Sequence, residues 1–528
     1  MRIHIKKYYY LLVLFSITLF NSCQSELWTE HYTIDPEVSS RISLWEAIKT
    51  NPELKKFAWA VKKTGYDKEL STEQIFTVWA PVDSSLDNID TTATIDLKIL
   101  ENQYVKNHIS KYSYRFSASG KERILFRDNK VSSFEKVGED YFIGTNKLFT
   151  NSSNYCASNG ILHIIQDKIP FHYNIWELLD SDERFDSLSN YLHKFDKIYF
   201  DERNSTPGDI NSKGETVYLD SILYNYNTKF QKLGSLSNED STYKALFLTN
   251  TAWSAAYEQI KSYYRYYASS SSASDKYTAD TLQRNNTMNS LTGDLFFRKA
   301  IANDTLISTR GNKIYNPFAG AEEKIASNGT AYISDYFNYN PWDSWNNNIV
   351  VEAERGTGRA YDPSFASVID RTYSGSDTIA ISKNRYTQVS PVYTSINQYI
   401  TFDIPNTLSG KLNPDSTLMY GAAYNIYCVF APNILMTDNP KPGKVSFTFY
   451  YRTEAGTVLS KSISTKVISA NQVSKVLIVS KMAFPYSEYG FVTPNVKLKV
   501  SNVATSKESA TYTRDMLIDA IILEPIRK

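Results

Sequence analysis

Two distant stretches of this chain carry the same pattern, and this internal repeat constrains the fold more than any other sequence feature. Residues 43–48 (Ser-Leu-Trp-Glu-Ala-Ile) align without a gap with residues 174–179 (Asn-Ile-Trp-Glu-Leu-Leu), at an offset of 131. Each copy opens with a residue that can cap a helix and has a Glu three positions later, the pattern of a capping box. The sequence therefore predicts two related units, each of which opens with a helix.

The parts that follow also match between the two copies. Residues 76–83 (Phe-Thr-Val-Trp-Ala-Pro-Val-Asp) match residues 243–250 at an offset of 167, and residues 159–165 match residues 328–334 at an offset of 169. Alternation of apolar and polar residues indicates that both pairs of segments contain strands. The increase of the offset from 131 to 167 locates an insertion of 36 residues in the second copy, between Tyr191 and Tyr243.

These motifs resemble those of the fasciclin (FAS1) family. Residues 76–83 resemble the first motif of the family, and residues 159–167 (Asn-Gly-Ile-Leu-His-Ile-Ile-Gln-Asp) resemble its closing motif. The resemblance implies an α+β fold, in which helices pack against a wedge of strands, and a role in adhesion or extracellular binding. We expect one fasciclin-like domain at residues 37–170 and a divergent second one, with the insertion, at residues 171–340.

The last third of the chain changes character near Trp342. Short alternating apolar runs separated by turn residues predict an antiparallel β-sandwich at residues 341–528. The predicted strands include residues 349–353, 399–404, 423–430, 445–450, 476–479, 496–500 and 516–523. Residues 350–354 and 517–525 resemble the opening and closing strands of galactose-binding-like jelly rolls, which include several families of carbohydrate-binding modules.

That resemblance also implies a structural calcium ion, and no other cofactor is expected. In those families two Glu and a late Asp often hold the ion, and here they would be Glu352, Glu354 and Asp519. Alternation along a strand places Glu352 and Glu354 on the same face, and calcium takes six to eight oxygen ligands. The alternative is a solvated acidic face without a metal ion, and the sequence leaves both open.

The N-terminus has the pattern of an exported protein. A basic start (Arg2, Lys6, Lys7) precedes a short apolar run at residues 8–20, which is typical of a secretory signal and shorter than the about 20 residues that span a membrane. Ser22 and Cys23 then resemble a bacterial lipobox. The resemblance implies that residues 1–22 are a lipoprotein signal peptide, that Cys23 carries the lipid, and that residues 23–36 form a linker.

Charge and cysteine content exclude other classes of protein. Lys and Arg number 57 against 56 Asp and Glu, whereas proteins that bind nucleic acid usually carry a basic excess. We therefore expect no nucleic-acid partner. With Cys23 lipidated, only Cys156 and Cys428 remain of the three cysteines, so a disulfide scaffold is excluded and both are expected to be free thiols.

Aromatic residues are numerous, and two groups of them stand out. Four tyrosines surround Arg265 in residues 263–267. They either form a stacking surface for sugars or peptides, or they end a helix and pack against the domain. Trp342 and Trp345 lie where the second fasciclin-like domain should meet the sandwich, and we expect them to pack between the two.

Known catalytic motifs are missing from the sequence. The histidines that follow Cys23 have no zinc-binding spacing, and neither a Gly-x-Ser-x-Gly motif nor a phosphate-binding loop occurs. These histidines are His31, His108, His163, His172 and His193. The sequence therefore predicts a protein that is not an enzyme.

Taken together, these features predict a lipid-anchored protein exposed on the outer membrane of a Bacteroidota-type bacterium. Residues 23–32 resemble the mature start of such lipoproteins. Proteins with this layout resemble accessory subunits of SusCD-type nutrient uptake complexes, which contain a TonB-dependent transporter and a SusD-like lipoprotein. The expected role is the binding of a glycan or peptide, or bracing of the complex. The alternative is a cell-surface adhesin that binds host or matrix glycoconjugates.

Overall fold

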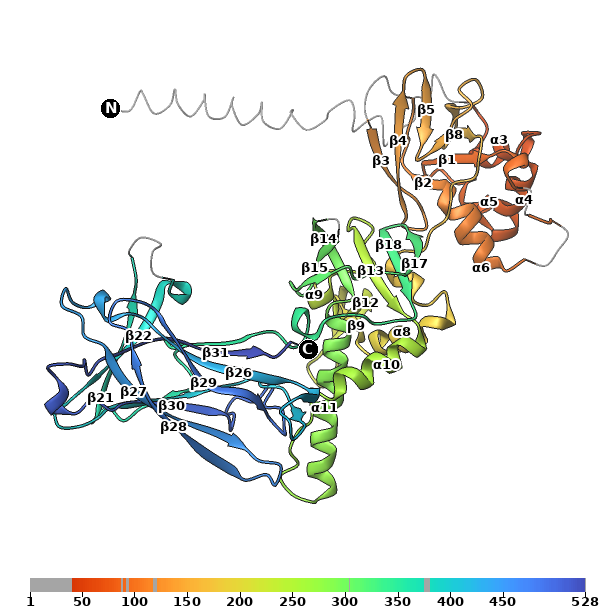
Figure 1. Cartoon of the computed structure of the whole chain (residues 1–528). Coiled ribbons are helices and arrows are strands. Elements are labelled where there is room, and N and C mark those ends of the chain that lie inside the picture. The colour runs from red at the N-terminus through yellow and green to blue at the C-terminus, as the bar shows by residue number, and fades with distance from the viewer. Residues whose placement is uncertain are drawn as a thin grey trace, which may run out of the picture. The chain divides into compact units, whose positions relative to one another are not determined.

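The computed structural model describes residues 40–86, 89–91, 95–116, 121–302, 304–374 and 380–527. The chain forms two compact units, shown in Figure 1. Unit 1 consists of the chain up to Leu178 together with the short segments Ser237–Thr242 and Ile325–Gly329, and unit 2 consists of the rest. The expected signal peptide, the linker and Cys23 lie outside the described residues, and the predicted domain boundaries stay predictions.

Unit 1 opens with the helix that the repeat predicts. The helix α3 (Leu44–Thr50) begins after Ser43, whose Oγ accepts a hydrogen bond from the N–H of Glu46 at 3.3 Å. The next helix, α4 (Lys55–Thr64), ends at Gly65, which has a φ of 82°, a left-handed conformation that glycine adopts without strain. The other α-helices in the described part of unit 1 are α5 (Tyr66–Glu69), α6 (Leu97–Leu100) and α7 (Ile175–Leu178).

Two four-stranded sheets complete unit 1. The first has the order β2-β1-β8-β7, with β1 (Phe76–Pro81) parallel to β8 (Gly160–Ile165). The two motifs of the first copy, far apart in sequence, are therefore neighbouring strands, and both are fully buried. The other strands are β2 (Ile109–Lys111), β3 (Lys121–Leu125), β4 (Val131–Val137), β5 (Asp140–Ile143), β6 (Asn146–Lys147) and β7 (Tyr155–Ala157), with the second sheet in the order β3-β4-β5-β6.

Asn159, which directly precedes β8, joins the helical and strand parts of unit 1. Its Oδ1 accepts a hydrogen bond from the N–H of Leu44 at 2.8 Å, and its Nδ2 donates to the carbonyls of Leu70 at 2.9 Å and Thr72 at 2.7 Å. The next residue is Gly160, where an added Cβ would lie 2.0 Å from the carbonyl oxygen of Phe76. The Asn-Gly pair is therefore fixed by packing and by buried hydrogen bonds.

The second copy of the repeat reproduces this arrangement. Asn174 and Glu177 form the predicted capping box at α7, because the N–H of Asn174 donates to Glu177 Oε2 at 2.9 Å and the N–H of Glu177 donates to Asn174 Oδ1 at 2.8 Å. Asn328 Oδ1 accepts from the N–H of Ile175 at 2.8 Å, as Asn159 does from Leu44. The two copies therefore share the same buried contact at matched positions.

The strands of the second copy form a six-stranded sheet with the order β16-β15-β14-β13-β18-β17. The matched motifs again become adjacent strands, β13 (Tyr243–Leu248) and β18 (Gly329–Ser334). The others are β14 (Phe296–Ala302), β15 (Thr305–Ser308), β16 (Lys313–Tyr315) and β17 (Glu322–Ala326). The helices of unit 2 are α8 (Asp186–His193), α9 (Phe230–Leu233), α10 (Asn250–Lys261) and α11 (Ala273–Gly293).

The insertion of the second copy contains four further strands. They are β9 (Asp196–Phe200), β10 (Thr206–Ile210), β11 (Thr216–Asp220) and β12 (Leu223–Asn227). β9 pairs with β12 and β10 pairs with β11, both antiparallel. The insertion is therefore a two-stranded ribbon rather than an irregular loop.

The last third of the chain is the predicted antiparallel β-sandwich. One sheet has the order β21-β22-β31-β26-β29, with β19 (Ile349–Glu352) beside β31, and the other has the order β20-β23-β30-β27-β28. The strands of the first sheet are β21 (Ala366–Thr372), β22 (Arg385–Pro391), β26 (Ala423–Phe430), β29 (Ser474–Ala483) and β31 (Met516–Pro525). Those of the second are β20 (Arg359–Ala360), β23 (Tyr399–Asp403), β27 (Gly443–Arg452), β28 (Val458–Ile468) and β30 (Lys497–Asn502), and a separate hairpin consists of β24 (Gly410–Leu412) and β25 (Leu418–Gly421).

Residues 263–267 follow α10 in the chain. Their tyrosine rings pack against the sandwich rather than form an exposed stacking surface. Tyr263, Tyr264 and Tyr266 are all buried, and the rings of Tyr264 and Tyr266 pack edge-on against Tyr489 and Phe491 of the sandwich. Of the two interpretations of this segment, the structure supports packing against the domain.

Taken over all described elements, the protein is mixed helix and sheet, with more strands than helices.

Two further expectations can be compared with the described residues. Cys156 and Cys428 are free thiols, as predicted. No helix within the described part of the chain is long and apolar enough to cross a membrane.

We predict that Asn159→Ala destabilises unit 1 by about 2–4 kcal/mol, because it leaves buried hydrogen-bonding groups of Leu44, Leu70 and Thr72 without a partner. Urea unfolding and hydrogen exchange at the Leu44 amide measure the effect. Asn151→Ala, at an exposed position of the same unit, is the control. Equal stability of the two variants would contradict the role assigned to Asn159.

Candidate functional site

A groove in unit 2 is the strongest candidate for a ligand site. It has a volume of about 740 Å³ and lies between the end of α10, residues 337–346 and the β24–β25 hairpin. Its lining combines aromatic, amide and carboxylate side chains, among them Glu258, Gln259, Asn338, Asn340, Trp342 and Tyr420. Cavities of this size that combine apolar surface with a few polar groups are typical ligand sites.

One wall of the groove is an aromatic stack. The ring of Trp345 lies 5.9 Å from that of Phe337, nearly parallel to it, and 5.8 Å from that of Tyr263, nearly perpendicular. Trp345 is buried, with 6% of its surface exposed, and its ring lies against those of Tyr263 and Phe337; its expected place between the second domain and the sandwich stays a prediction. Trp342 is only half-buried and lines the groove instead, which the sequence did not predict.

A buried carboxylate holds the segment that forms this wall. Asp294 has 1% of its surface exposed and accepts hydrogen bonds from Ser308 Oγ at 2.6 Å, from Asn312 Nδ2 at 3.0 Å and from Ser344 Oγ. Its main-chain carbonyl accepts from the hydroxyl of Tyr339 at 3.0 Å. Tyr339 of the wall and Ser344 of the same segment are therefore held by Asp294, which lies between α11 and β14.

The floor of the groove is also fixed. Asn346 is buried, and its Oδ1 accepts a hydrogen bond from the hydroxyl of Tyr424 at 3.2 Å. Burial raises the pKa of Tyr263 to about 12, so this ring stays a neutral part of the wall at physiological pH.

The rim of the groove, by contrast, faces solvent. Glu258, Gln259, Asn338, Asn340 and Tyr420 are all exposed. A rigid floor with a polar and aromatic rim suits a ligand that has both hydroxyl groups and apolar C–H faces, because amides and carboxylates bind hydroxyls and aromatic rings cover apolar faces.

The predicted calcium ligands lie on the first and last strands of the sandwich, with Glu352 on β19, Glu354 just after it and Asp519 on β31. β19 is antiparallel to β31, with Glu352 opposite Ala520. Ser382 contacts two of the carboxylates, because its Oγ donates to Glu352 Oε1 at 2.8 Å and its N–H donates to Asp519 Oδ1 at 3.1 Å. Lys383 Nζ lies 3.2 Å from Glu352 Oε1.

The three carboxylates influence one another. Burial raises the pKa of Asp519 to about 7; the hydrogen bond from Ser382 opposes the change, and the charges of Glu352 and Glu354 add to it. Buried Oε2 atoms of Glu352 and Glu354 have no hydrogen-bond partner among the described residues. Oxygen donors without partners fit a hard cation. Within the described ranges, however, no three acidic, histidine or cysteine side chains are arranged closely enough to hold a metal ion.

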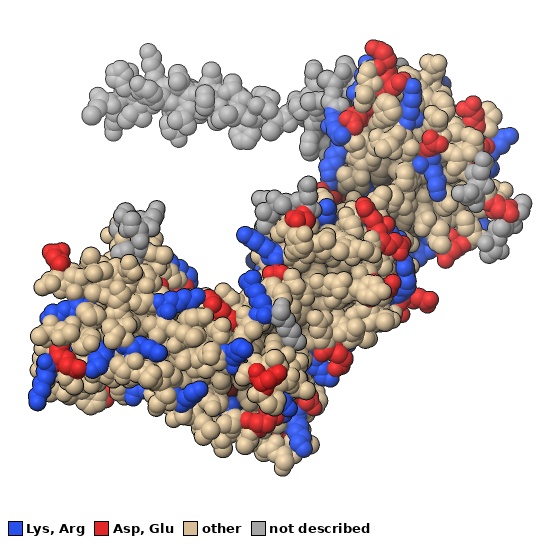
Figure 2. Space-filling model, viewed as in Figure 1, with Lys and Arg blue, Asp and Glu red and all other residues tan. Residues whose placement is uncertain are grey.

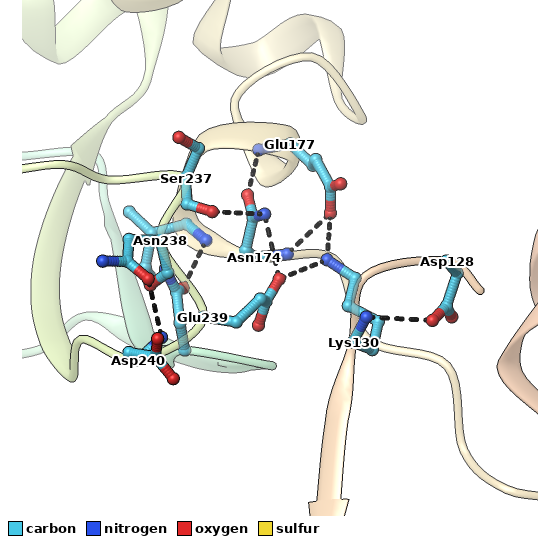
Figure 3. A network of polar contacts seen from close by, with 10 residues as sticks. Asp128, Lys130, Asn174, Glu177, Ser237, Asn238, Glu239 and Asp240 are labelled. Carbon is cyan, nitrogen blue, oxygen red and sulfur yellow. Dashed lines mark hydrogen bonds and ion pairs between the residues drawn. The ribbon is translucent and has the colours of Figure 1, made fainter. Parts of the chain in front are cut away.

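Unit 1 contains a buried polar network, drawn in Figure 3, which the sequence did not predict. Lys130 has a side chain that is 10% exposed, and its Nζ donates to Glu177 Oε2 at 2.5 Å and to Glu239 Oε1 at 2.7 Å. Asn174 Nδ2 also donates to Glu239, at 3.1 Å. The lysine therefore forms ion pairs with two carboxylates and offsets one of their two negative charges; Glu177 also belongs to the capping box of α7.

The buried histidines of unit 1 have structural roles. Burial lowers the pKa of His163 to about 4 and that of His108 to about 3, so both are neutral at physiological pH. His163 contacts the carbonyl oxygen of Tyr114 and stacks beside Trp79, while His108 Nε2 accepts from the N–H of Ile169. Neither histidine is available as a general base.

Comparison with known proteins identifies part of this architecture. Residues 52–169 match the family model of the fasciclin domain. The chain therefore contains a fasciclin (FAS1) domain in this segment, as the motifs at residues 76–83 and 159–167 predict. No curated protein matches the chain.

Several solved structures are similar to parts of the chain. They include modules of a xylanase from Clostridium thermocellum complexed with xylohexaose (14% identity, 34% of this chain, 29% of that chain, TM-score 0.23). A FAS1 domain pair from the insect cell adhesion molecule fasciclin I is 14% identical to this chain. The match covers 55% of this chain and 98% of that chain, with a TM-score of 0.21. A xylan-binding CBM22 domain from Paenibacillus barcinonensis is 11% identical to this chain. The match covers 34% of this chain and 94% of that chain, with a TM-score of 0.21.

This chain thus spans less than a third of the xylanase chain. All three TM-scores are below 0.5, so these likenesses support no conclusion about the ligand or activity of this chain.

We predict that the stability of unit 2 falls as the pH rises from about 4 to about 7. The pKa of Asp519 is raised to about 7, above the about 3.9 of an unfolded Asp. In this interval the folded state binds the extra proton, and linkage makes it less stable with increasing pH. Calorimetry measures the effect. Asp519→Asn should remove this component, whereas Asp515→Asn should keep it; an identical pH profile for Asp519→Asn and the unmodified chain would contradict the assignment.

Proposed function

We propose that this chain is a non-catalytic cell-surface protein that binds a glycan in the groove of unit 2. The observation that carries the proposal is the placement of Trp342 and Tyr420 beside exposed amide and carboxylate side chains over a fixed floor. An extended saccharide offers hydroxyl groups and apolar ring faces, which match these groups. A peptide would make the same aromatic contacts, but it would form hydrogen bonds with fewer of the polar side chains of the groove.

Further observations support a binding role rather than catalysis. The groove residues form no nucleophile and base pair of the kind that acyl or glycosyl transfer requires. Basic and acidic side chains are interspersed over the visible face of both units in Figure 2. This distribution provides no continuous basic surface on that face for a polyanion.

We expect Trp342→Ala and Tyr420→Ala each to weaken glycan binding about tenfold or more, because each removes one aromatic face from the groove. The measurement is a glycan array followed by calorimetric titration with the tightest saccharide. Tyr336→Ala is the matched control, since Tyr336 is an exposed aromatic residue close in sequence that does not line the groove. If all three variants bind alike, the ligand site lies elsewhere; if no saccharide binds the unmodified chain, the glycan proposal fails.

The proposal extends to the place of the protein in the cell. A lipid on Cys23 would hold it on the outer membrane, exposed at the cell surface. There it would act as an accessory subunit of a SusCD-type uptake complex, beside a TonB-dependent transporter and a SusD-like lipoprotein. The lipobox-like residues and the fasciclin domain at residues 52–169 support an exported protein of this kind.

Fractionation and mild-detergent purification test this placement. Cys23→Ala should move the protein from the membrane to the soluble fraction, while Cys156→Ala should not. A tagged unmodified chain should co-purify with an integral barrel protein and a second lipoprotein. Membrane association of Cys23→Ala would contradict the anchor, and purification of the tagged chain alone would contradict the complex.

The second candidate function is a cell-surface adhesin, which the fasciclin domain favours. The two functions differ in the partner that is bound. An adhesin should attach cells to immobilised host or matrix glycoconjugates without a transporter, and deletion of the gene should reduce attachment but not growth on a glycan.

For the acidic cluster we propose a structural calcium ion held by Glu352, Glu354 and Asp519. The partnerless buried oxygens support this, although the side chains would have to turn toward the ion. The same calorimetric series tests it, because millimolar calcium at pH 7.5 should raise the unfolding temperature of the unmodified chain and not that of Asp519→Asn. No shift with the unmodified chain would exclude the site.

A further inference from the structure

The ribbon of the second copy, formed by β9, β10, β11 and β12, exposes apolar side chains on both faces. Leu219, Ile198 and Ile210 are 78%, 71% and 70% exposed. The other exposed apolar side chains of the ribbon are Tyr199, Val217, Ile222, Leu223 and Tyr224. An isolated two-stranded ribbon is marginally stable in water, and large apolar patches on a soluble protein usually mark an interaction site.

The two edges of the ribbon differ in chemistry. Folded proteins protect free strand edges with lysine, proline or bulges. The edge formed by β9 and β10 carries Lys197 and Pro207. The edge formed by β11 and β12 contains no lysine or proline in residues 216–227. The β10–β11 ladder has register shifts on both sides of Pro207, whereas β12 pairs with β9 in continuous register. The β12 part of this edge therefore has none of these protections.

Hydrogen bonding shows which main-chain groups this edge offers. The N–H of Asp201 donates to the carbonyl of Ile222 at 2.9 Å, and the N–H of Thr228 donates to the carbonyl of Phe195 at 3.0 Å. In an antiparallel ladder alternate residues bond to the partner strand. Even-numbered residues of β12 therefore bond to β9, and the N–H and carbonyl groups of Leu223 and Asn225 point to the free edge.

The charge of the ribbon indicates what kind of chain would pair there. Residues 196–227 hold six carboxylates against three basic side chains, although the whole chain is almost neutral. Asp220 is the charged residue of the edge formed by residues 216–227 and is exposed. A second copy of this acidic ribbon and an anionic membrane surface would both be repelled, whereas a basic segment would be attracted.

We propose that the β11–β12 edge is a docking site for an extended, basic segment of another protein, which adds to the ribbon as a third strand. Main-chain hydrogen bonds to Leu223 and Asn225 would set the register of the added strand, and the exposed apolar side chains would cover its alternate residues. This interaction is separate from the groove and does not depend on the glycan proposal.

Photocrosslinking in intact cells tests the docking site. A benzoylphenylalanine at position 219 of the full-length chain should give one adduct with another envelope protein. The crosslinked peptide of that protein should be rich in Lys and Arg. The same group at Tyr277, which is 68% exposed on α11, should give no such adduct. No adduct from position 219, an adduct between two copies of this chain, or an adduct with lipid would each overturn the proposal.

Two pairs of variants examine the mechanism. Asn225→Pro removes the N–H at the free edge and should reduce the yield of the adduct at least tenfold. Asn225→Ala keeps this N–H, and its adduct yield should stay within twofold of that of the unmodified chain. Asp220→Lys reverses the charge of the free edge and should also reduce the adduct at least tenfold, whereas Asp209→Lys on β10 should not. If Asn225→Pro lowers the unfolding temperature, the comparison of Asp220→Lys with Asp209→Lys tests the proposal instead. Equal adduct yields from those two variants would overturn it.

Discussion

The buried carboxylate of Asp294 is the interaction on which the architecture of unit 2 depends. A carboxylate taken out of water is costly unless hydrogen bonds replace its hydration. Here Ser308 and Asn312 donate from the turn between β15 and β16, and Ser344 donates from the segment that leads into the sandwich. One side chain therefore connects a sheet of the second copy to the wall of the groove, and the groove has its shape because that segment cannot move away.

Main-chain hydrogen bonds reinforce this connection. The N–H of Ser409 donates to the carbonyl of Tyr263 at 2.9 Å, and the N–H of Ser487 donates to that of Arg265 at 2.6 Å. The hydroxyl of Ser409 accepts from the N–H of Arg265 at 2.9 Å. Tyr263, Tyr264 and Tyr266 of this segment are buried, so they pack at the junction between the second copy and the sandwich.

Local patterns predicted the parts of the structure that local forces determine. The capping residues Ser43 and Asn174 and the alternating strands of the sandwich were predictable, because each depends on neighbours within a few positions. Other features could not be predicted, because their partners are distant in sequence. These are the roles of Asp294 and Lys130 and the exposed face of Trp342. The sequence located the insertion between Tyr191 and Tyr243 but did not predict that it forms the strands β9 to β12, and no sequence pattern shows that those strands would lack a covering layer.

The two copies of the repeat have diverged in the surface that they offer. The first buries its asparagine and its matched strands, and it contains the segment that matches the fasciclin family. The second keeps the same asparagine contact, at Asn328, but adds a ribbon and shares its α10 with the groove. Because the asparagine contact and the paired motif strands are kept, the second copy could acquire new surface without losing this part of its framework. Binding functions in this protein are therefore expected where the second copy departs from the first, at the ribbon and at the groove.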